Sequence, residues 1–108
     1  MSFKNQTAEQ IAARLEAGED LLLVDVREPD EWAIAAIEGA EQRSMSTLND
    51  WWEELPRDRE VVIVCHHGGR SAQVCQALAA QAGFENLTNM QGGIDRWAAL
   101  VDPSLARY

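Results

Sequence analysis

The sequence contains no long apolar run and no pattern typical of an export signal. No stretch approaches the roughly 20 apolar residues that a helix needs to cross a bilayer. Residues 1–6 also lack a charged segment followed by an apolar stretch and a small-residue cleavage site, so secretion by that route is not expected. We therefore expect a cytoplasmic protein that does not associate with a membrane.

Positive charge is scarce. Lys4 is the only lysine, and the nine basic residues face 18 acidic ones, which gives a formal net charge of −9. Such a surface repels phosphate backbones, and this argues against nucleic-acid binding. The acidic residues are spread along the chain rather than gathered in a tail, so we expect them to favour solubility rather than docking to a basic partner.

Cysteine is also rare, because Cys65 and Cys75 are the only two. In a chain expected to be cytoplasmic, reducing conditions disfavour a disulfide between them. Each cysteine is therefore either a reactive thiol or a small buried side chain.

The overall composition is typical of a soluble globular protein. The hydrophobic share is 46% and the charged share is 25%. A chain of 108 residues is long enough for one compact domain without disulfides or a structural metal. We expect a single domain, 1–108, with no linker.

Local patterns predict alternating strands and helices. Thr7 and Gln10 form a capping-box pattern at a helix start, and Gly18 suits the end of that helix. Pro29 suits the first position of a short helix, because its missing N–H would lack a partner there. Predicted helices cover 8–17, a short segment from Pro29, a segment capped by Ser46 or Thr47 and followed by Pro56, 71–82 and 94–101; predicted strands cover 21–26, 60–65 and 86–88, with room for another within 39–42. This alternation predicts an α/β fold with a mainly parallel central sheet flanked by helices.

The segment Cys65–Ser71 joins the clearest strand to the clearest helix. A cysteine there lies at the carboxyl end of a parallel strand, which is where open α/β sheets bind their ligands. Gly68 and Gly69 allow a tight turn and a close approach to a ligand. The N–H groups of such a turn and the positive end of the following helix form an anion site.

This setting favours a reactive thiol at Cys65. The thiolate is the nucleophilic form, and helix N-termini and nearby cations such as Arg70 stabilise it. A strand-end cysteine can also be an inert core residue, but the glycine pair and the arginine that follow favour a functional role. We expect the loop to prefer anionic substrates.

The loop resembles that of the rhodanese family, which begins with cysteine, spans six residues and leads into a helix. Three further segments are similar to family motifs: Asp25-Val26-Arg27-Glu28, Ile37-Glu38-Gly39-Ala40 and Gln91-Gly92-Gly93-Ile94-Asp95-Arg96-Trp97. The second departs from the family pattern, because Ala36 and Glu38 replace its histidine and proline. The resemblance covers nearly the whole chain, in the family's order.

The resemblance implies a sulfurtransferase with a rhodanese-like fold. In such an enzyme Cys65 takes the outer sulfur of thiosulfate or a similar small anionic donor, becomes a persulfide, and passes the sulfur to cyanide, a thiol or a protein acceptor. His66, His67, Gly68, Gly69 and Arg70 would then line the donor site. No cofactor is implied.

Several of these residues have a second interpretation. Arg70 could bind the donor anion or pair with one of the acids, and we favour the first. The histidines could simply shape the loop. Zinc ligation by Cys65, His66, His67 and Cys75 is disfavoured, because adjacent residues in a tight loop rarely point at one ion and paired-cysteine zinc spacings are absent.

Cys75 and the pair Asp25 and Arg27 are assigned mainly structural roles. Cys75 lies on an apolar helical stripe, so we interpret it as a small buried residue in preference to a second sulfur-carrying cysteine. Asp25 and Arg27 are interpreted as a charged pair that braces the loops around the pocket, in preference to a role for Arg27 in attracting anions.

Two rival functions remain. A cysteine phosphatase or arsenate reductase would use a similar loop, but with one more residue than the four that separate Cys65 from Arg70. A non-catalytic binding module with this fold would not need Cys65 and the intact glycine-rich loop. The shorter loop and the presence of Cys65 in an intact glycine-rich loop both favour the sulfurtransferase.

Overall fold

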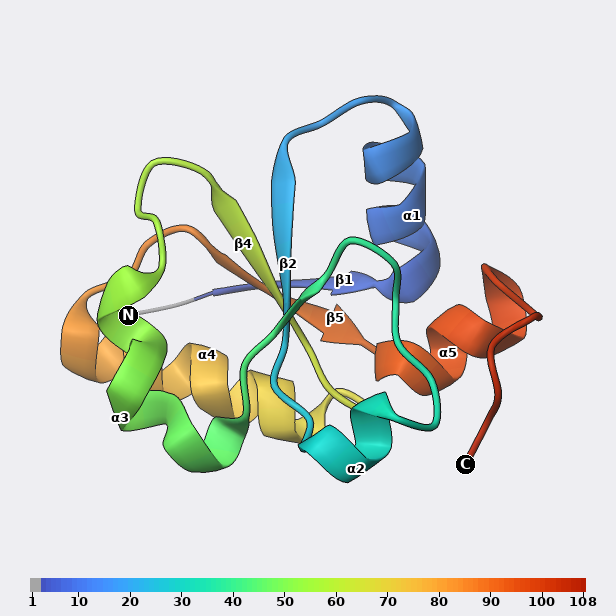
Figure 1. The fold of residues 1–108 in the computed structure, drawn as a ribbon. Helices are drawn as coiled ribbons and strands as arrows, with labels where there is room; N and C mark the ends of the chain where they lie inside the picture. Colours follow the sequence, from blue (N-terminus) through green and yellow to red (C-terminus); the bar gives the residue numbers. More distant parts are fainter. Residues whose placement is uncertain (1–2) are drawn as a thin grey trace.

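Residues 3–108, described in a computed structural model, form one parallel sheet with helices on both faces (Figure 1). The strands are β1 (Lys4–Thr7), β2 (Leu21–Asp25), β3 (Glu41–Gln42), β4 (Glu60–Val64) and β5 (Leu87–Gln91). Their order across the sheet is β1-β5-β4-β2-β3, and every neighbouring pair is parallel. The predicted α/β fold with a parallel sheet is confirmed.

The helices divide between the two faces of the sheet. They are α1 (Ala8–Glu16), α2 (Pro29–Trp32), α3 (Leu48–Trp51), α4 (Gly69–Ala82) and α5 (Gly93–Leu100), with 3₁₀ turns at Met45–Thr47 and Trp52–Glu54. Helices α1 and α5 pack on one face and α3 and α4 on the other (Figure 1). Within β4, Val61 and Ile63 face the α4 side, while Val62 and Val64 face the α1 side. Because both faces are covered, β4 is apolar at every position after Glu60.

Local signals set several element boundaries as expected. The capping box at α1 is present: the Thr7 side chain accepts from the Gln10 N–H at 3.3 Å, and the Gln10 side chain accepts from the Thr7 N–H at 2.8 Å. Pro29 is the first residue of α2. Gly83 ends α4 in the left-handed conformation that glycine tolerates best.

Two segments differ from the prediction by more than the position of their ends. Strand β1 was not predicted. The prediction of a single helix after Ser46 or Thr47 is wrong, because the chain forms a succession of short 3₁₀ and α-helical turns there. The Thr47 side chain does not cap α3. There the Thr47 hydroxyl and the Trp51 indole N–H both donate to the carbonyl of Ser44, at 3.2 and 2.9 Å, and so hold the turns against the core.

Within residues 3–108, none of the helices has both the length and the apolar character needed to cross a membrane.

Candidate active site

Cys65 lies at the carboxyl end of β4, immediately before a tight turn into α4. Only 1% of the residue is exposed. Gly68, with a φ of +106°, is the residue before α4, and its N–H donates to Cys65 Sγ at 3.1 Å. The sulfur therefore receives a backbone hydrogen bond beside the positive end of a 14-residue helix. This environment favours negative charge on the sulfur.

The start of α5 braces the same loop from the other side. The backbone N–H of Ile94 donates to the carbonyl of Cys65 at 2.9 Å, and that of Asp95 donates to the carbonyl of His66 at 3.0 Å. Such a close approach of two backbones requires glycine at position 93, whose φ is +58°. The Gln91–Trp97 motif thus holds the backbone of the Cys65 loop in place.

Asp25 and Arg27 form a fully buried pair, as interpreted from the sequence. Arg27 Nη2 lies 2.7 Å from Asp25 Oδ2, with side-chain exposures of 0% and 1%. The guanidinium also donates to the carbonyls of Glu31 and Ala35 and to the Tyr108 hydroxyl. Arg27 therefore braces the segment around α2, because its charge and its hydrogen-bond donors are used inside the protein.

Arg70 binds a carboxylate. Its two terminal nitrogens donate to the two oxygens of Glu31 at 2.6 and 2.8 Å. The hydrogen bonds from Arg70 lower the pKa of Glu31 to about 2, so this carboxylate is charged at neutral pH. Tyr108 also donates its hydroxyl hydrogen to Glu31 at 2.8 Å. The charge at the loop rim is therefore balanced, and Arg70 reaches a substrate anion only in competition with Glu31.

The two histidines of the loop lie in a stack of rings. Tyr108 stacks on His66 with ring centroids 3.9 Å apart, and His66 lies 3.8 Å from His67. Burial and the neighbouring His67 lower the pKa of His66, which favours its neutral form. His67 has 66% of its side chain exposed. The histidines thus shape the surface of the loop, and His67 is the one open to solvent.

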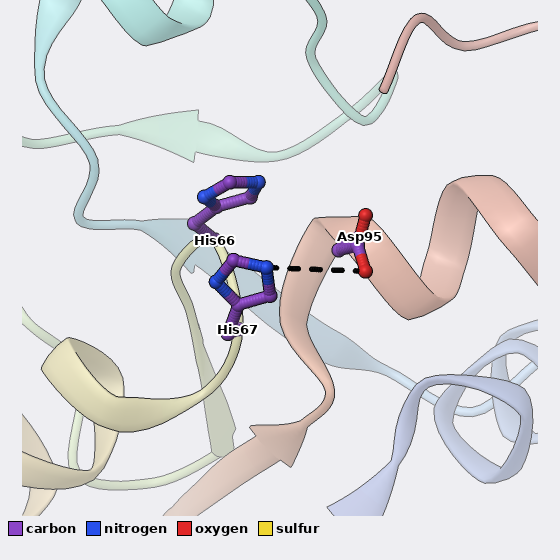
Figure 2. A group of neighbouring side chains, drawn as sticks. All are labelled: His66, His67 and Asp95. Carbon is purple, nitrogen blue, oxygen red and sulfur yellow. Dashed lines mark ion pairs between the residues drawn. The ribbon is translucent and has the colours of Figure 1, made fainter. Parts of the chain in front are cut away.

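His66, His67 and Asp95 form the group that most resembles a metal-ligand set among residues 3–108 (Figure 2). Figure 2 shows His67 pointing toward Asp95, with Nε2 3.9 Å from the carboxylate. However, the Arg107 guanidinium already binds both Asp95 oxygens, each at 3.1 Å. A metal ion would have to displace that cation, so these residues fit a metal poorly. Neither cysteine belongs to the group.

Cys75 is a core residue, as interpreted from the sequence. It is 0% exposed and packs on α4 in one cluster with Val74 and Leu78. Burial raises the pKa of its thiol to about 12, so it stays protonated. This environment makes Cys75 a poor nucleophile.

Three residues around the loop were not identified from the sequence. Glu31 and Tyr108 lie far from Arg70 in the chain, and no local pattern connects them to it. Asn89 reaches Cys65 through Ser71, whose hydroxyl lies 3.3 Å from Cys65 Sγ. The predicted strand 86–88 stops one residue before Asn89; a strand extended to Gln91 would have marked Asn89 as a buried polar group that needs a partner.

Comparison with known proteins agrees with this geometry. The rhodanese-like domain family matches residues 7–100. The chain is 43% identical over 91 residues to a sulfurtransferase of Allochromatium vinosum, and the match covers 84% of each protein. It is 30% identical over 107 residues to the thiosulfate sulfurtransferase GlpE of Pseudoalteromonas translucida, and that match covers 99% of this chain and 100% of the relative. A crystal structure of a rhodanese-like domain protein from Staphylococcus aureus superposes with a TM-score of 0.80 at 27% identity, covering 98% and 99% of the two chains.

The fold and the cysteine loop thus agree with the match to rhodanese-like domains and with the likeness to proteins named as sulfurtransferases. The chain belongs to the family of rhodanese-like domains. It also matches larger proteins: it is 38% identical to a probable adenylyltransferase/sulfurtransferase, MoeZ, of Mycobacterium tuberculosis, and spans only 26% of the length of that relative.

Proposed function

We propose that this protein transfers a sulfane sulfur through a persulfide on Cys65. The Cys65 thiolate attacks the outer sulfur of thiosulfate, the S–S bond of thiosulfate breaks, and sulfite leaves with the bonding electron pair. An acceptor such as cyanide then attacks the outer sulfur of the persulfide. The persulfide S–S bond breaks, thiocyanate leaves, and the thiolate is restored. Two easier displacements thus replace one direct transfer.

The observation that carries this proposal is the position of Cys65 Sγ, 3.1 Å from the Gly68 N–H at the start of α4. A backbone donor beside a helix N-terminus stabilises negative charge on the sulfur in each of its anionic forms. We assign Cys65 as the nucleophile, with His66, His67, Gly68, Gly69 and Arg70 lining the donor site. The acceptor in the cell is a thiol or a protein thiol.

We also propose that the protein acts in the cytoplasm. Cys65 and Cys75 are both free thiols, and a reducing compartment keeps them so.

A loading assay tests the function. The protein is incubated with thiosulfate, digested, and examined by mass spectrometry. The peptide that contains Cys65 should gain the mass of one sulfur atom and lose it when cyanide is added, with thiocyanate as the product. Hydrolysis of a phosphate ester without sulfur loading would instead favour the phosphatase alternative. If a folded protein showed no sulfur loading and no phosphate ester hydrolysis, the binding module would be favoured.

Substitution of Glu31 by glutamine should improve the use of thiosulfate. Glu31 neutralises Arg70, and removal of its charge leaves that guanidinium free to attract the donor anion. A partly exposed ion pair is worth up to about 1 kcal/mol, so the KM for thiosulfate should fall roughly fivefold with little change in kcat.

Glu54→Gln is the matched control, because it removes the same charge from an exposed pair with Arg43, on a residue that is not part of the loop. It should leave the KM unchanged. Equal KM values for the Glu31→Gln variant and the wild type would show that Arg70 does not bind the donor.

A further inference from the structure

A chain of buried polar side chains lies behind Cys65. Ser71 Oγ is 3.3 Å from Cys65 Sγ and 2.5 Å from Asn89 Oδ1, and Asn89 Nδ2 donates to Asn5 Oδ1 at 3.1 Å. Ser71 is 0% exposed and Asn89 is 4% exposed. The chain begins at the end of β4, passes through α4 and β5, and ends on β1, where Asn5 is the register partner of Asn89.

The amide of Asn89 fixes the direction of these hydrogen bonds. Its nitrogen donates to Asn5, so its oxygen faces Ser71. An amide oxygen has no hydrogen to give, and the contact between the two oxygens therefore requires the hydroxyl hydrogen of Ser71. A serine hydroxyl has only one hydrogen, so Ser71 presents only lone pairs to Cys65. The thiol hydrogen of Cys65 completes the chain as the donor to Ser71.

An anionic sulfur changes this arrangement. A thiolate or a persulfide has no hydrogen to donate, and the lone pairs of Ser71 would repel it. The Ser71 hydroxyl can turn and donate to the sulfur instead, but the buried oxygen of Asn89 then loses its partner. Asn89 and the anionic sulfur therefore compete for the same hydrogen atom.

We propose that Asn89 is a positioning residue that restrains the reactivity of Cys65 by holding the Ser71 hydroxyl hydrogen away from the sulfur. This inference rests on the proposed role of Cys65 as the sulfur carrier. It assigns Ser71 as the donor that turns toward the sulfur when charge develops there.

The charged and titratable groups around the loop stay the same in the test. They are Arg70 and Cys75 on α4, His66 and His67 in the loop, Glu31 on α2, Asp95 on α5, Asp25 at the end of β2, Arg27 after it, and Tyr108. The substitutions concern only the neutral side chains of Ser71 and Asn89, so a change in the pH profile of Cys65 reports on the hydrogen bonds themselves.

The experiment measures the alkylation rate of Cys65 by iodoacetamide as a function of pH, with the Cys65 peptide quantified by mass spectrometry. Asn89→Leu keeps the branched shape of the side chain and removes the competing oxygen. The midpoint of its pH profile should lie about one pH unit below that of the wild type, which means roughly tenfold faster alkylation on the acidic side of the profile. The exposed Asn5 can bind water in place of Asn89.

A double variant identifies the path of the effect. Because Asn89 acts only through Ser71, the Ser71→Ala/Asn89→Leu protein should have the same midpoint as Ser71→Ala alone. Thr88→Val is the matched control: Thr88 is equally buried on β5, but its hydroxyl binds Glu60 and not the chain behind Cys65, so its midpoint should match the wild type.

An unchanged or raised midpoint in Asn89→Leu would overturn the proposal, as would a shift that persists without Ser71. Thermal unfolding monitored by circular dichroism establishes that each variant is folded, and Asn89→Ala replaces Asn89→Leu if the leucine does not fit. Alkylation needs no sulfur donor, so this result is independent of whether the protein transfers sulfur from thiosulfate.

Discussion

Replacement of Cys65 by alanine is expected to abolish sulfur transfer, with a loss of about a thousandfold or more in kcat/KM, because no other group can carry the sulfur covalently. The alanine leaves the turn intact, since the bonds from Ile94 and Asp95 reach the loop through its backbone. Only the thiol and its contacts with Gly68 and Ser71 are lost. The thiocyanate assay measures the loss of transfer, and mass spectrometry of the peptide that contains position 65 should show no added sulfur in the variant.

Cys75→Ala is the matched control for this variant. It removes a thiol of the same size from the core of α4, where burial keeps the sulfur protonated. This protein should lose some stability and retain its activity. If Cys75→Ala were folded and as inactive as Cys65→Ala, the second cysteine would have to take part in sulfur transfer, and the single-carrier mechanism would be wrong.

Gly93→Ala should destabilise the fold by about 3 kcal/mol, from roughly 1 for an alanine at positive φ and roughly 2 for the steric overlap that it creates. The added methyl group would collide with the carbonyl oxygens of Cys65 and His66. For a chain of about this size the midpoint of thermal unfolding should fall by roughly 10–20 °C. Sulfur transfer should fall as well, because the loop has to move away from α5.

Gly39→Ala separates the two contributions. Gly39 also has a positive φ, of +87°, but no atom lies within 4 Å of the place where its methyl group would be. The Gly39→Ala variant should lose only the stability that alanine costs at positive φ, about 1 kcal/mol. If calorimetry found equal losses for the two variants, the close packing of α5 against the loop would contribute nothing to stability.

The sequence predicts those parts of the fold that local chemistry controls. The β-branched run of β4, the capping box at Thr7 and the position of Pro29 each depend on residues that are neighbours in the chain. Strand β1 could not be predicted in the same way. Its residues, Lys-Asn-Gln-Thr, carry no apolar signal, because the strand lies at an edge of the sheet and is held through backbone pairing with β5.

The same distinction applies to the candidate site. The motif predicts the position of Cys65, because a strand, a glycine turn and a helix follow each other directly. The pairing of Arg70 with Glu31 joins residues 39 positions apart, and the contact of Tyr108 with Arg27 joins residues 81 positions apart. Which of the 18 acids would neutralise Arg70 depends on the packing of α2 against the loop, and no periodicity encodes that.

The hydrogen bonds from α5 to the Cys65 loop also set an order of assembly during synthesis. A chain leaves the ribosome from its amino end, so β4, Cys65 and α4 are made before residues 93–95 are available. Until then the carbonyls of Cys65 and His66 lack the donors that fix the turn. Strand β1 also has to wait for its partner β5, because Asn5 pairs with Asn89, which lies 84 positions later in the chain. A nascent or truncated chain that ends before α5 therefore carries Cys65 in an unbraced loop, and the reactive cysteine matures only when the carboxyl-terminal part of the fold has docked.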